Sequence, residues 1–116
     1  MNVEDLTPTE ISAKLREGSI VLIDVREPQE YAAERIHGAL LYPLSTFDPA
    51  ALPEAGKRSI VFHCGSGMRS TKAVMQCAGA GLTHRAHMAG GIQAWKAAGL
   101  PTIAFDPATG QVIDRR

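Results

Sequence analysis

The chain has 116 residues, which is the size of one domain and enough to bury a single ordinary core. Twelve basic and twelve acidic side chains cancel, so no net field favours nucleic acid or an anionic membrane, and a small molecule or a protein is the expected partner. Because the acidic start lacks an apolar signal region and no stretch has the roughly 18 apolar residues of a membrane span, we expect a soluble, cytoplasmic protein.

The first elements predict an α/β domain. Thr7 is a capping residue followed by proline and, three residues on, by glutamate, and Gly18 is suited to end a helix, so the pattern predicts a helix over 8–17. Residues 20–25 are apolar and rich in β-branched side chains, which is typical of a strand covered on both faces of a parallel sheet.

The same alternation of strands and helices continues to the end of the chain. The remaining expected elements are a helix over 28–36, strands over 39–44 and 59–63, a helix over 69–78, a strand over 84–88 and a helix over 92–98. Residues 104–116 carry weak signals. We therefore divide the chain into a domain over 1–103 and a C-terminal tail or arm over 104–116.

The sequence CGSGMRS, which follows the expected strand over 59–63, is the candidate site. Cys64 stands at the carboxyl end of that strand, where open α/β sheets place their ligands. Gly65 and Gly67 can adopt positive φ and turn backbone N–H groups inward, while the following helix and Arg69 add positive charge. Such surroundings favour the reactive thiolate.

Each candidate also has a purely structural interpretation. A free cysteine is often a small buried hydrophobe, but the position of Cys64, the glycines and the arginine together favour a nucleophile. Cys77 lies mid-helix among apolar residues and is expected to be inert. His63 should point away from Cys64, because neighbouring side chains of a strand alternate, and we interpret it as structural. The other histidines are expected to be framework or surface residues: His37, His84 and His87.

Three motifs in the right order resemble the single-domain rhodanese family. They are IDVREPQEYAAERIHGA at 23–39, CGSGMRS at 64–70 and GGIQAWKAAGLP at 90–101. The resemblance implies a three-layer α/β fold, with a five-stranded, mainly parallel sheet and helices on both faces. It also implies a sulfurtransferase, with thiosulfate or a similar donor and cyanide or a thiol as acceptor.

The resemblance also implies the roles of particular residues. Cys64 matches the family's nucleophile, which takes a sulfane sulfur and becomes a persulfide. Asp24 and Arg26 match a framework element beside the site. The expected substrate-binding residues are those of the loop: Gly65, Ser66, Gly67, Met68 and Arg69. No cofactor and no metal are expected, since two cysteines are too few for a zinc site or a disulfide framework.

The length of the loop bears on the choice of substrate. Cysteine-dependent phosphatases and some arsenate reductases share this architecture but have five residues between cysteine and arginine, whereas this chain has four and places Ser70 in the arginine's position. The resemblance implies that the shorter loop fits a bound sulfur atom, whereas the longer loop surrounds a tetrahedral oxyanion. The loop positions that carry extra cations in some family members are here Gly65, Ser66 and Met68, which predicts weak affinity for free thiosulfate.

A second hypothesis is a sulfur relay to a protein acceptor, or a regulatory module that binds a partner. The fold does not decide between these functions, because function depends on the site. The departures at Arg35 and His37, where the family commonly has histidine and proline, remove no catalytic group.

Overall fold

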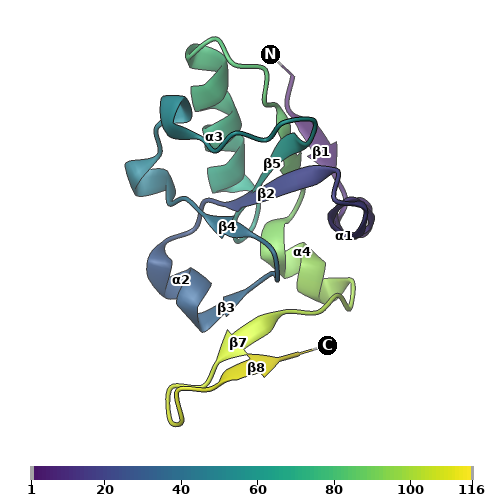
Figure 1. The fold of residues 1–116 in the computed structure, drawn as a ribbon, viewed down its shortest axis with the longest axis vertical. Coiled ribbons are helices and arrows are strands. Elements are labelled where there is room, and N and C mark those ends of the chain that lie inside the picture. Colours follow the sequence, from purple (N-terminus) through teal and green to yellow (C-terminus); the bar gives the residue numbers. More distant parts are fainter. Residues whose placement is uncertain (1, 116) are drawn as a thin grey trace.

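The computed structural model describes residues 2–115 (Figure 1). Strands and helices alternate along the chain. In chain order the elements are β1 (Glu4–Leu6), α1 (Pro8–Glu17), β2 (Ile20–Asp24), α2 (Pro28–Ala33), β3 (Glu34–Arg35), β4 (Leu40–Leu41), the 3₁₀ turns η1 (Leu44–Thr46) and η2 (Pro49–Ala51), β5 (Ser59–His63), α3 (Met68–Gly79), β6 (Ala86–Met88), α4 (Gly91–Ala97), β7 (Ile103–Phe105) and β8 (Val112–Asp114).

Five of the strands form one sheet in the order β1-β6-β5-β2-β4. Every neighbouring pair in this sheet is parallel, and β5 lies at its centre between β6 and β2. Strands that run parallel need crossover connections, and helices lie in them: α1 between β1 and β2, α2 between β2 and β4, and α3 between β5 and β6. The predicted α/β fold with a five-stranded parallel sheet is confirmed.

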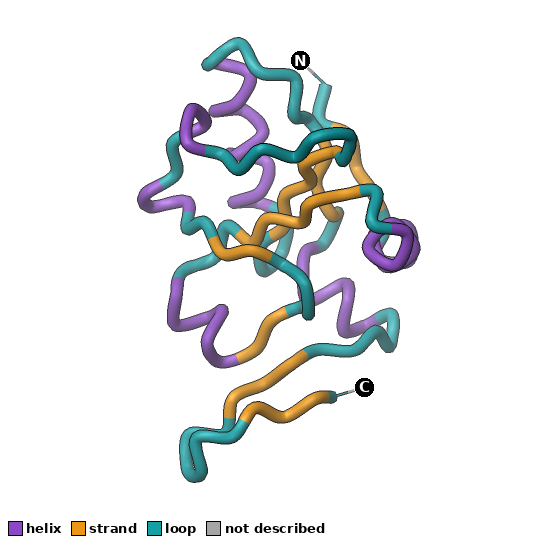
Figure 2. Tube along the Cα trace, viewed as in Figure 1, coloured by secondary structure: helices purple, strands orange, loops and turns teal. Residues whose placement is uncertain are grey.

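Helices cover both faces of this sheet, because the side chains of each strand alternate between the faces (Figure 2). On one face α1 and α4 contribute Ile11 and Trp95 to a cluster that includes Leu22. On the other face α3 contributes Val74 to a cluster that includes Phe62. The two clusters bury β5 completely from its second residue onward, so the strand leads the chain from the core directly into the loop at its carboxyl end.

The capping residues predicted for the first helix form the expected hydrogen bonds. The Glu10 N–H donates to Thr7 Oγ1 over 3.2 Å, and the Thr7 N–H donates to Glu10 Oε1 over 3.1 Å. Gly18 ends the helix in the left-handed region with φ of 70°. The helix therefore spans 8–17 as predicted.

The helix predicted over 28–36 is too long, since α2 ends at Ala33. Glu34 and Arg35 leave the helix to form β3, which pairs antiparallel with β7. This pairing joins segments about 70 residues apart, so the local helical pattern contains no sign of it.

The strand predicted over 39–44 is also too long, since β4 consists only of Leu40–Leu41. Pro43 lacks an N–H group for a sheet hydrogen bond, and η1 begins directly after it. The short edge strand β1 was not predicted, because Leu6 is its only buried residue and three residues give no readable period.

The tail forms a hairpin in which β7 pairs with both β3 and β8 in a second, antiparallel sheet. In Figure 1 this hairpin lies below the main sheet, next to α2 and α4. Residues 104 and 105 belong to β7, so the division of the chain after residue 103 falls inside a strand. No helix within residues 2–115 is long and apolar enough to cross a membrane.

Candidate active site

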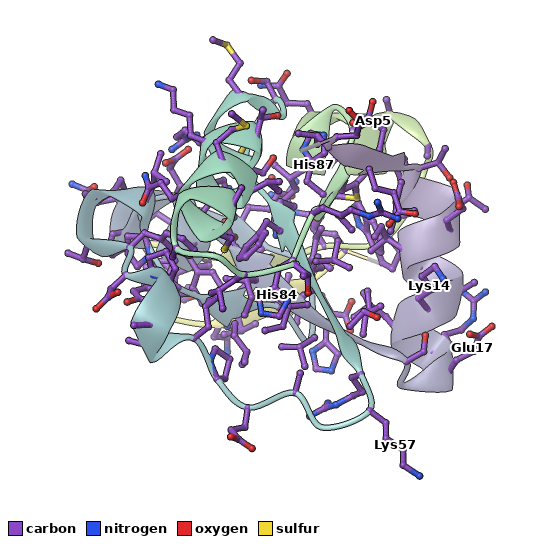
Figure 3. All side chains as sticks on the ribbon, turned by 90° about the horizontal axis from the view of Figure 1, so that it is seen from above. Asp5, Lys14, Glu17, Lys57, His84 and His87 are labelled. Carbon is purple, nitrogen blue, oxygen red and sulfur yellow. The ribbon has the colours of Figure 1, made fainter. Side chains whose placement is uncertain are left out.

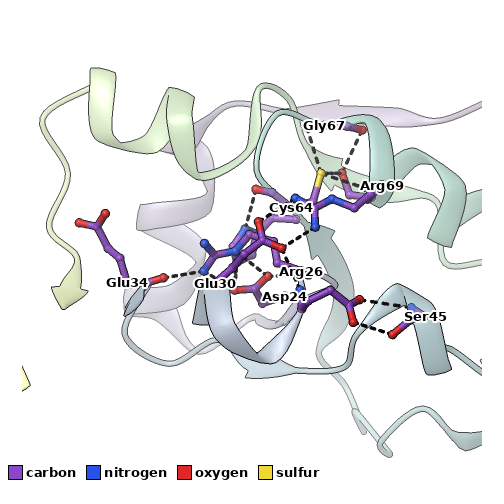
Figure 4. Close-up of polar contacts among 11 residues, drawn as sticks. Asp24, Arg26, Glu30, Glu34, Ser45, Cys64, Gly67 and Arg69 are labelled. Carbon is purple, nitrogen blue, oxygen red and sulfur yellow. Dashed lines mark hydrogen bonds and ion pairs between the residues drawn. The ribbon is translucent and has the colours of Figure 1, made fainter. Parts of the chain in front are cut away.

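The loop from Cys64 to Gly67 connects β5 with α3 at the carboxyl edge of the main sheet (Figure 4). Gly67 has φ of +107°, a conformation that side chains with a Cβ rarely adopt, and it precedes the first residue of α3. The N–H groups of Gly67 and Ser70 donate to Cys64 Sγ over 3.1 and 3.3 Å. The backbone therefore surrounds the sulfur with hydrogen-bond donors.

These donors decide the charge of the sulfur. Burial alone raises the pKa of the Cys64 thiol, because the thiolate is poorly solvated inside the protein. The hydrogen bond with the Ser70 side chain and those from the backbone N–H groups of Ser70, Gly67 and Ser66 outweigh this effect and bring the pKa below its ordinary value. The loop thus favours a thiolate on a residue with no exposed surface.

The two loop glycines have different roles. Gly67 uses positive φ, but Gly65 does not, so the expectation that both turn in this way is wrong for Gly65. A Cβ at Gly65 would lie 3.2 Å from Arg69 Nη2. Gly65 therefore leaves room for the guanidinium rather than shaping the backbone.

Arg69 does not present an unpaired charge to the loop. Its Nη1 and Nη2 donate to the two carboxylate oxygens of Glu30 on α2, over 2.6 and 2.9 Å. The hydrogen bond from Arg69 lowers the pKa of Glu30 to about 2. Sequence reasoning missed Glu30, because α2 and α3 meet only in the folded chain.

This ion pair predicts how the stability of the protein depends on pH. Glu30 has a lower pKa in the folded chain, so its contribution to stability is full above the ordinary value of 4.5 and is lost as the pH falls toward about 2. The side chain of Glu30 is more than a third exposed, so water screens the ion pair. Glu30→Gln should therefore lower the free energy of unfolding by only about 0.5 kcal/mol at neutral pH. Urea unfolding should show this difference shrinking between pH 4.5 and about 2, with Glu17→Gln as the exposed control. A difference that stays constant over this range would contradict the assignment.

Asp24 and Arg26 form a buried ion pair at the end of the neighbouring strand β2. Arg26 Nη2 donates to Asp24 Oδ2 over 2.8 Å, and its Nε lies within 3.1 Å of both carboxylate oxygens. The same Nη2 also donates to the Glu34 backbone oxygen over 2.6 Å. The pair thereby ties the end of α2, which carries Glu30, to the edge of the sheet that carries Cys64 (Figure 4).

His63 is buried on the face of the sheet opposite to that of Cys64, as the alternation along the strand predicted. Its Nε2 lies 3.6 Å from Asp24 Oδ2 and makes no hydrogen bond within residues 2–115. Burial lowers its pKa, although Asp24 opposes the shift, so His63 is neutral at physiological pH. His63 is a framework residue and has no contact with the sulfur through its side chain.

Ser70, His87 and Asp5 form a second polar group beside the sulfur. The Cys64 thiol donates to Ser70 Oγ over 3.5 Å, and Ser70 Oγ lies 2.8 Å from His87 Nδ1. His87 Nε2 lies 2.7 Å from Asp5 Oδ1. No local pattern in the sequence indicates this group, since Asp5 is 82 residues from His87 and meets it only because β1 pairs with β6.

The glycine-rich start of α4 closes the site from the other side. The N–H of Ile92 donates to the Cys64 backbone oxygen over 2.8 Å, and a Cβ on Gly91 would lie 2.3 Å from that same oxygen. Only glycine permits this approach, so the two motifs at 64–70 and 90–101 form one packed unit.

The other predicted residues lie at the edges of the site. Met68 is 72% exposed, and with Ser66 and Gly67 it lines a pocket of about 520 Å³ that Lys72 also borders. Cys77 lies in the buried cluster beneath α3, and burial raises the pKa of its thiol. The structure thus separates a hydrogen-bonded, ionisable cysteine from an apolar one.

The sulfur of Cys64 accepts hydrogen bonds from backbone N–H groups at the carboxyl edge of a parallel sheet, which defines a protein with a cysteine in a loop of N–H donors. Residues 7–98 match the rhodanese-like domain, and the chain belongs to this family. It is 33% identical to a protein from Allochromatium vinosum named "Sulfurtransferase", covering 88% of this chain and 96% of that one.

Other curated relatives are longer than the present chain. An uncharacterized Synechocystis protein is 39% identical over 84% of this chain and 55% of its own length. The probable adenylyltransferase/sulfurtransferase MoeZ of Mycobacterium tuberculosis is 38% identical over 78% of this chain and 24% of its own length. The chain thus spans about half or less of these two relatives.

Solved structures share the fold. The rhodanese-like domain of the Alr3790 protein from Anabaena matches with a TM-score of 0.76 and 24% identity, over 96% of this chain and 89% of that one. A Rhodopseudomonas palustris protein described as a possible tyrosine phosphatase matches with a TM-score of 0.69 and 27% identity, over 85% and 83%. The fold alone therefore does not choose between the chemistries that the loop sequence raised.

Proposed function

We propose that the protein is a sulfurtransferase in which Cys64 carries a sulfane sulfur as a persulfide. The observation that carries the proposal is the pair of N–H groups, from Gly67 and Ser70, that donate to Cys64 Sγ. They favour the thiolate and lie where they would also stabilise charge that develops on the sulfur during transfer.

The reaction is a double displacement. The Cys64 thiolate attacks the outer sulfur of a donor such as thiosulfate, the S–S bond of the donor breaks, and sulfite leaves. A cyanide ion or a thiolate acceptor then attacks the outer sulfur of the persulfide, and Cys64 leaves as the thiolate. Because Cys64 has no exposed surface, the donor reaches the sulfur only after a local movement of the loop.

Two features of the loop favour this reaction over phosphate-ester hydrolysis. Four residues, not five, separate Cys64 from Arg69, and the guanidinium is held by Glu30. A phosphoryl group must be held inside the loop and would find no unpaired guanidinium there for bidentate binding, whereas a single transferred sulfur needs only the N–H donors. Hydrolysis of an aryl phosphate by the protein would favour the phosphatase hypothesis instead.

The pairing of Arg69 with Glu30 also supports the second candidate function, a sulfur relay to a protein acceptor. A paired arginine attracts free thiosulfate weakly, whereas Met68, exposed at the edge of the loop, offers apolar surface to a protein. The relative MoeZ, whose name includes sulfurtransferase, shows that such a domain occurs within a larger chain. Faster turnover with a protein acceptor than with cyanide would favour the relay.

The decisive measurement is the mass of the protein after incubation with thiosulfate. We expect a gain of one sulfur atom, mapped to Cys64 by peptide analysis and removed by cyanide or by a thiol. Steady-state kinetics should be of the ping-pong type, because the donor's product leaves before the acceptor reacts. A sulfur found on Cys77, with Cys64 unmodified, would refute the assignment.

A further inference from the structure

A continuous row of polar side chains leads from the buried sulfur to the surface. It runs from Cys64 Sγ to Ser70 Oγ (3.5 Å), on to His87 Nδ1 (2.8 Å), and from His87 Nε2 to Asp5 Oδ1 (2.7 Å). Figure 3 shows Asp5 and His87 next to each other, with His84 apart from them. The mechanism above uses Ser70 only as a hydrogen-bond donor and does not use His87 or Asp5.

The row joins three elements and crosses from the interior to solvent. Cys64 and Ser70 have no exposed surface, the side chain of His87 is 6% exposed, and that of Asp5 is 69% exposed. The register of the sheet places Asp5 directly opposite His87 in parallel strands, so both side chains lie on the face that carries Cys64. The proton of the buried thiol has no direct route to water, and this row supplies one.

The hydrogen-bond directions follow from the chemistry of the groups. The Asp5 carboxylate only accepts, so His87 Nε2 carries a hydrogen and, in the neutral ring, Nδ1 is an acceptor. The Ser70 hydroxyl then donates to Nδ1 over 2.8 Å, in preference to the Gly67 backbone oxygen at 3.2 Å. With its hydrogen directed to His87, Ser70 Oγ accepts from the Cys64 thiol.

We propose that Ser70, His87 and Asp5 take up the proton of the Cys64 thiol and so generate the nucleophile. The thiol proton passes to Ser70 Oγ while the hydroxyl proton of Ser70 passes to His87 Nδ1. The products are a thiolate and an imidazolium, the total charge is unchanged, and no oxidant or reductant takes part. This inference rests on the proposed function, since it assigns the activation of the same thiol.

Asp5 stabilises the imidazolium by accepting from Nε2, and in the charged state the hydrogen of Nδ1 faces Ser70, whose hydroxyl then donates to the thiolate. Asp5 and Lys72 of α3 are the charged residues that line the pocket with His87. His87 and Asp5 act through Ser70 and are therefore positioning residues.

Coupled protonation of His87 and Cys64 distinguishes this proton relay from a purely structural hydrogen-bond network. Nitrogen NMR of the imidazole should show that His87 keeps its added proton to higher pH in the wild type than in Cys64→Ser, because the thiolate adds to the stabilisation of the imidazolium by Asp5 and a serine hydroxyl does not. The ultraviolet absorbance of the thiolate in His87→Gln should appear at higher pH than in the wild type, with an approximately ten-fold smaller acid dissociation constant of the thiol. Asp5→Asn should give a smaller shift in the same direction.

Control variants distinguish an effect on the proton relay from unfolding of the protein. Ser70→Ala should act like His87→Gln, whereas Ser70→Thr, which keeps the hydroxyl, should restore most of the thiolate. His37→Gln changes an exposed histidine outside the row and should leave the thiolate curve unchanged. Thermal unfolding of every variant reports whether it is folded.

The proposed proton relay is refuted if His87 gains its proton at the same pH in the wild type and in Cys64→Ser. It is also refuted if the thiolate absorbance of His87→Gln follows the wild-type curve. Failure of the relay and failure of the proposed function give different results. If a persulfide forms on Cys64 but the protonation of His87 does not depend on Cys64, only the proton relay is refuted. If the two protonations are coupled but no persulfide forms, the sulfurtransferase proposal is refuted.

Discussion

Replacement of Cys64 with serine is expected to abolish sulfur transfer, with turnover falling at least about a thousand-fold, because a hydroxyl forms no persulfide. Cys77→Ser is the matched control. Cys77 lies in the apolar cluster beneath α3, so its replacement should lower stability and leave turnover per folded molecule close to that of the wild type. Sulfite release from thiosulfate, measured with cyanide as acceptor, provides the readout.

The outcome of this comparison depends on the loop rather than on the mere presence of a thiol. Both cysteines are buried, but only Cys64 receives N–H hydrogen bonds that lower its pKa. Turnover that survives in Cys64→Ser and disappears in Cys77→Ser would contradict the assignment of the nucleophile.

Replacement of Asp24 with asparagine is expected to lower the free energy of unfolding by about 3–5 kcal/mol. Asp24 is fully buried and Arg26 is 5% exposed, so the variant leaves a guanidinium in the core without its counter-charge. Urea unfolding at neutral pH measures the loss. The effect should be among the largest of any single polar substitution in this chain.

An exposed ion pair serves as the control for Asp24. Lys96 contacts Glu34 over 2.7 Å but is half exposed, so Lys96→Met should cost no more than about 1 kcal/mol. Adding Arg26→Met to Asp24→Asn should recover part of the stability, because the unpaired charge is removed together with its partner. A loss below about 1 kcal/mol for Asp24→Asn would show that water solvates the guanidinium.

The ion pair also connects stability to the site. Arg26 binds the backbone oxygen of Glu34 just after α2, and α2 carries the Glu30 that holds Arg69. We therefore expect Asp24→Asn to disturb the position of Arg69 and to reduce sulfur transfer even where the variant stays folded. We expect the residues interpreted from sequence as framework to act on the loop through this route.

The sequence by itself determined the parts of this protein that depend on local chemistry. Thr7, Glu10 and Gly18 specify a helix through contacts within a few residues, and the apolar run of β2 requires burial on two faces. The motifs around Cys64 identify the rhodanese-like family in the same way, and they predict Cys64 as the reactive position. These signals are readable because every group involved lies close in the chain.

Only the tertiary structure decided which distant groups meet at the sulfur. Glu30 reaches Arg69 across 39 residues, and Asp5 reaches His87 across 82 residues, through the order of the strands and the packing of α2 beside the loop. Pairing with β7 makes residues 34–35 a strand, and pairing of β7 with β8 makes the tail a hairpin. Charge and proton transfer depend on distances of about 3 Å, which are set by strand register and helix packing and have no counterpart in sequence spacing.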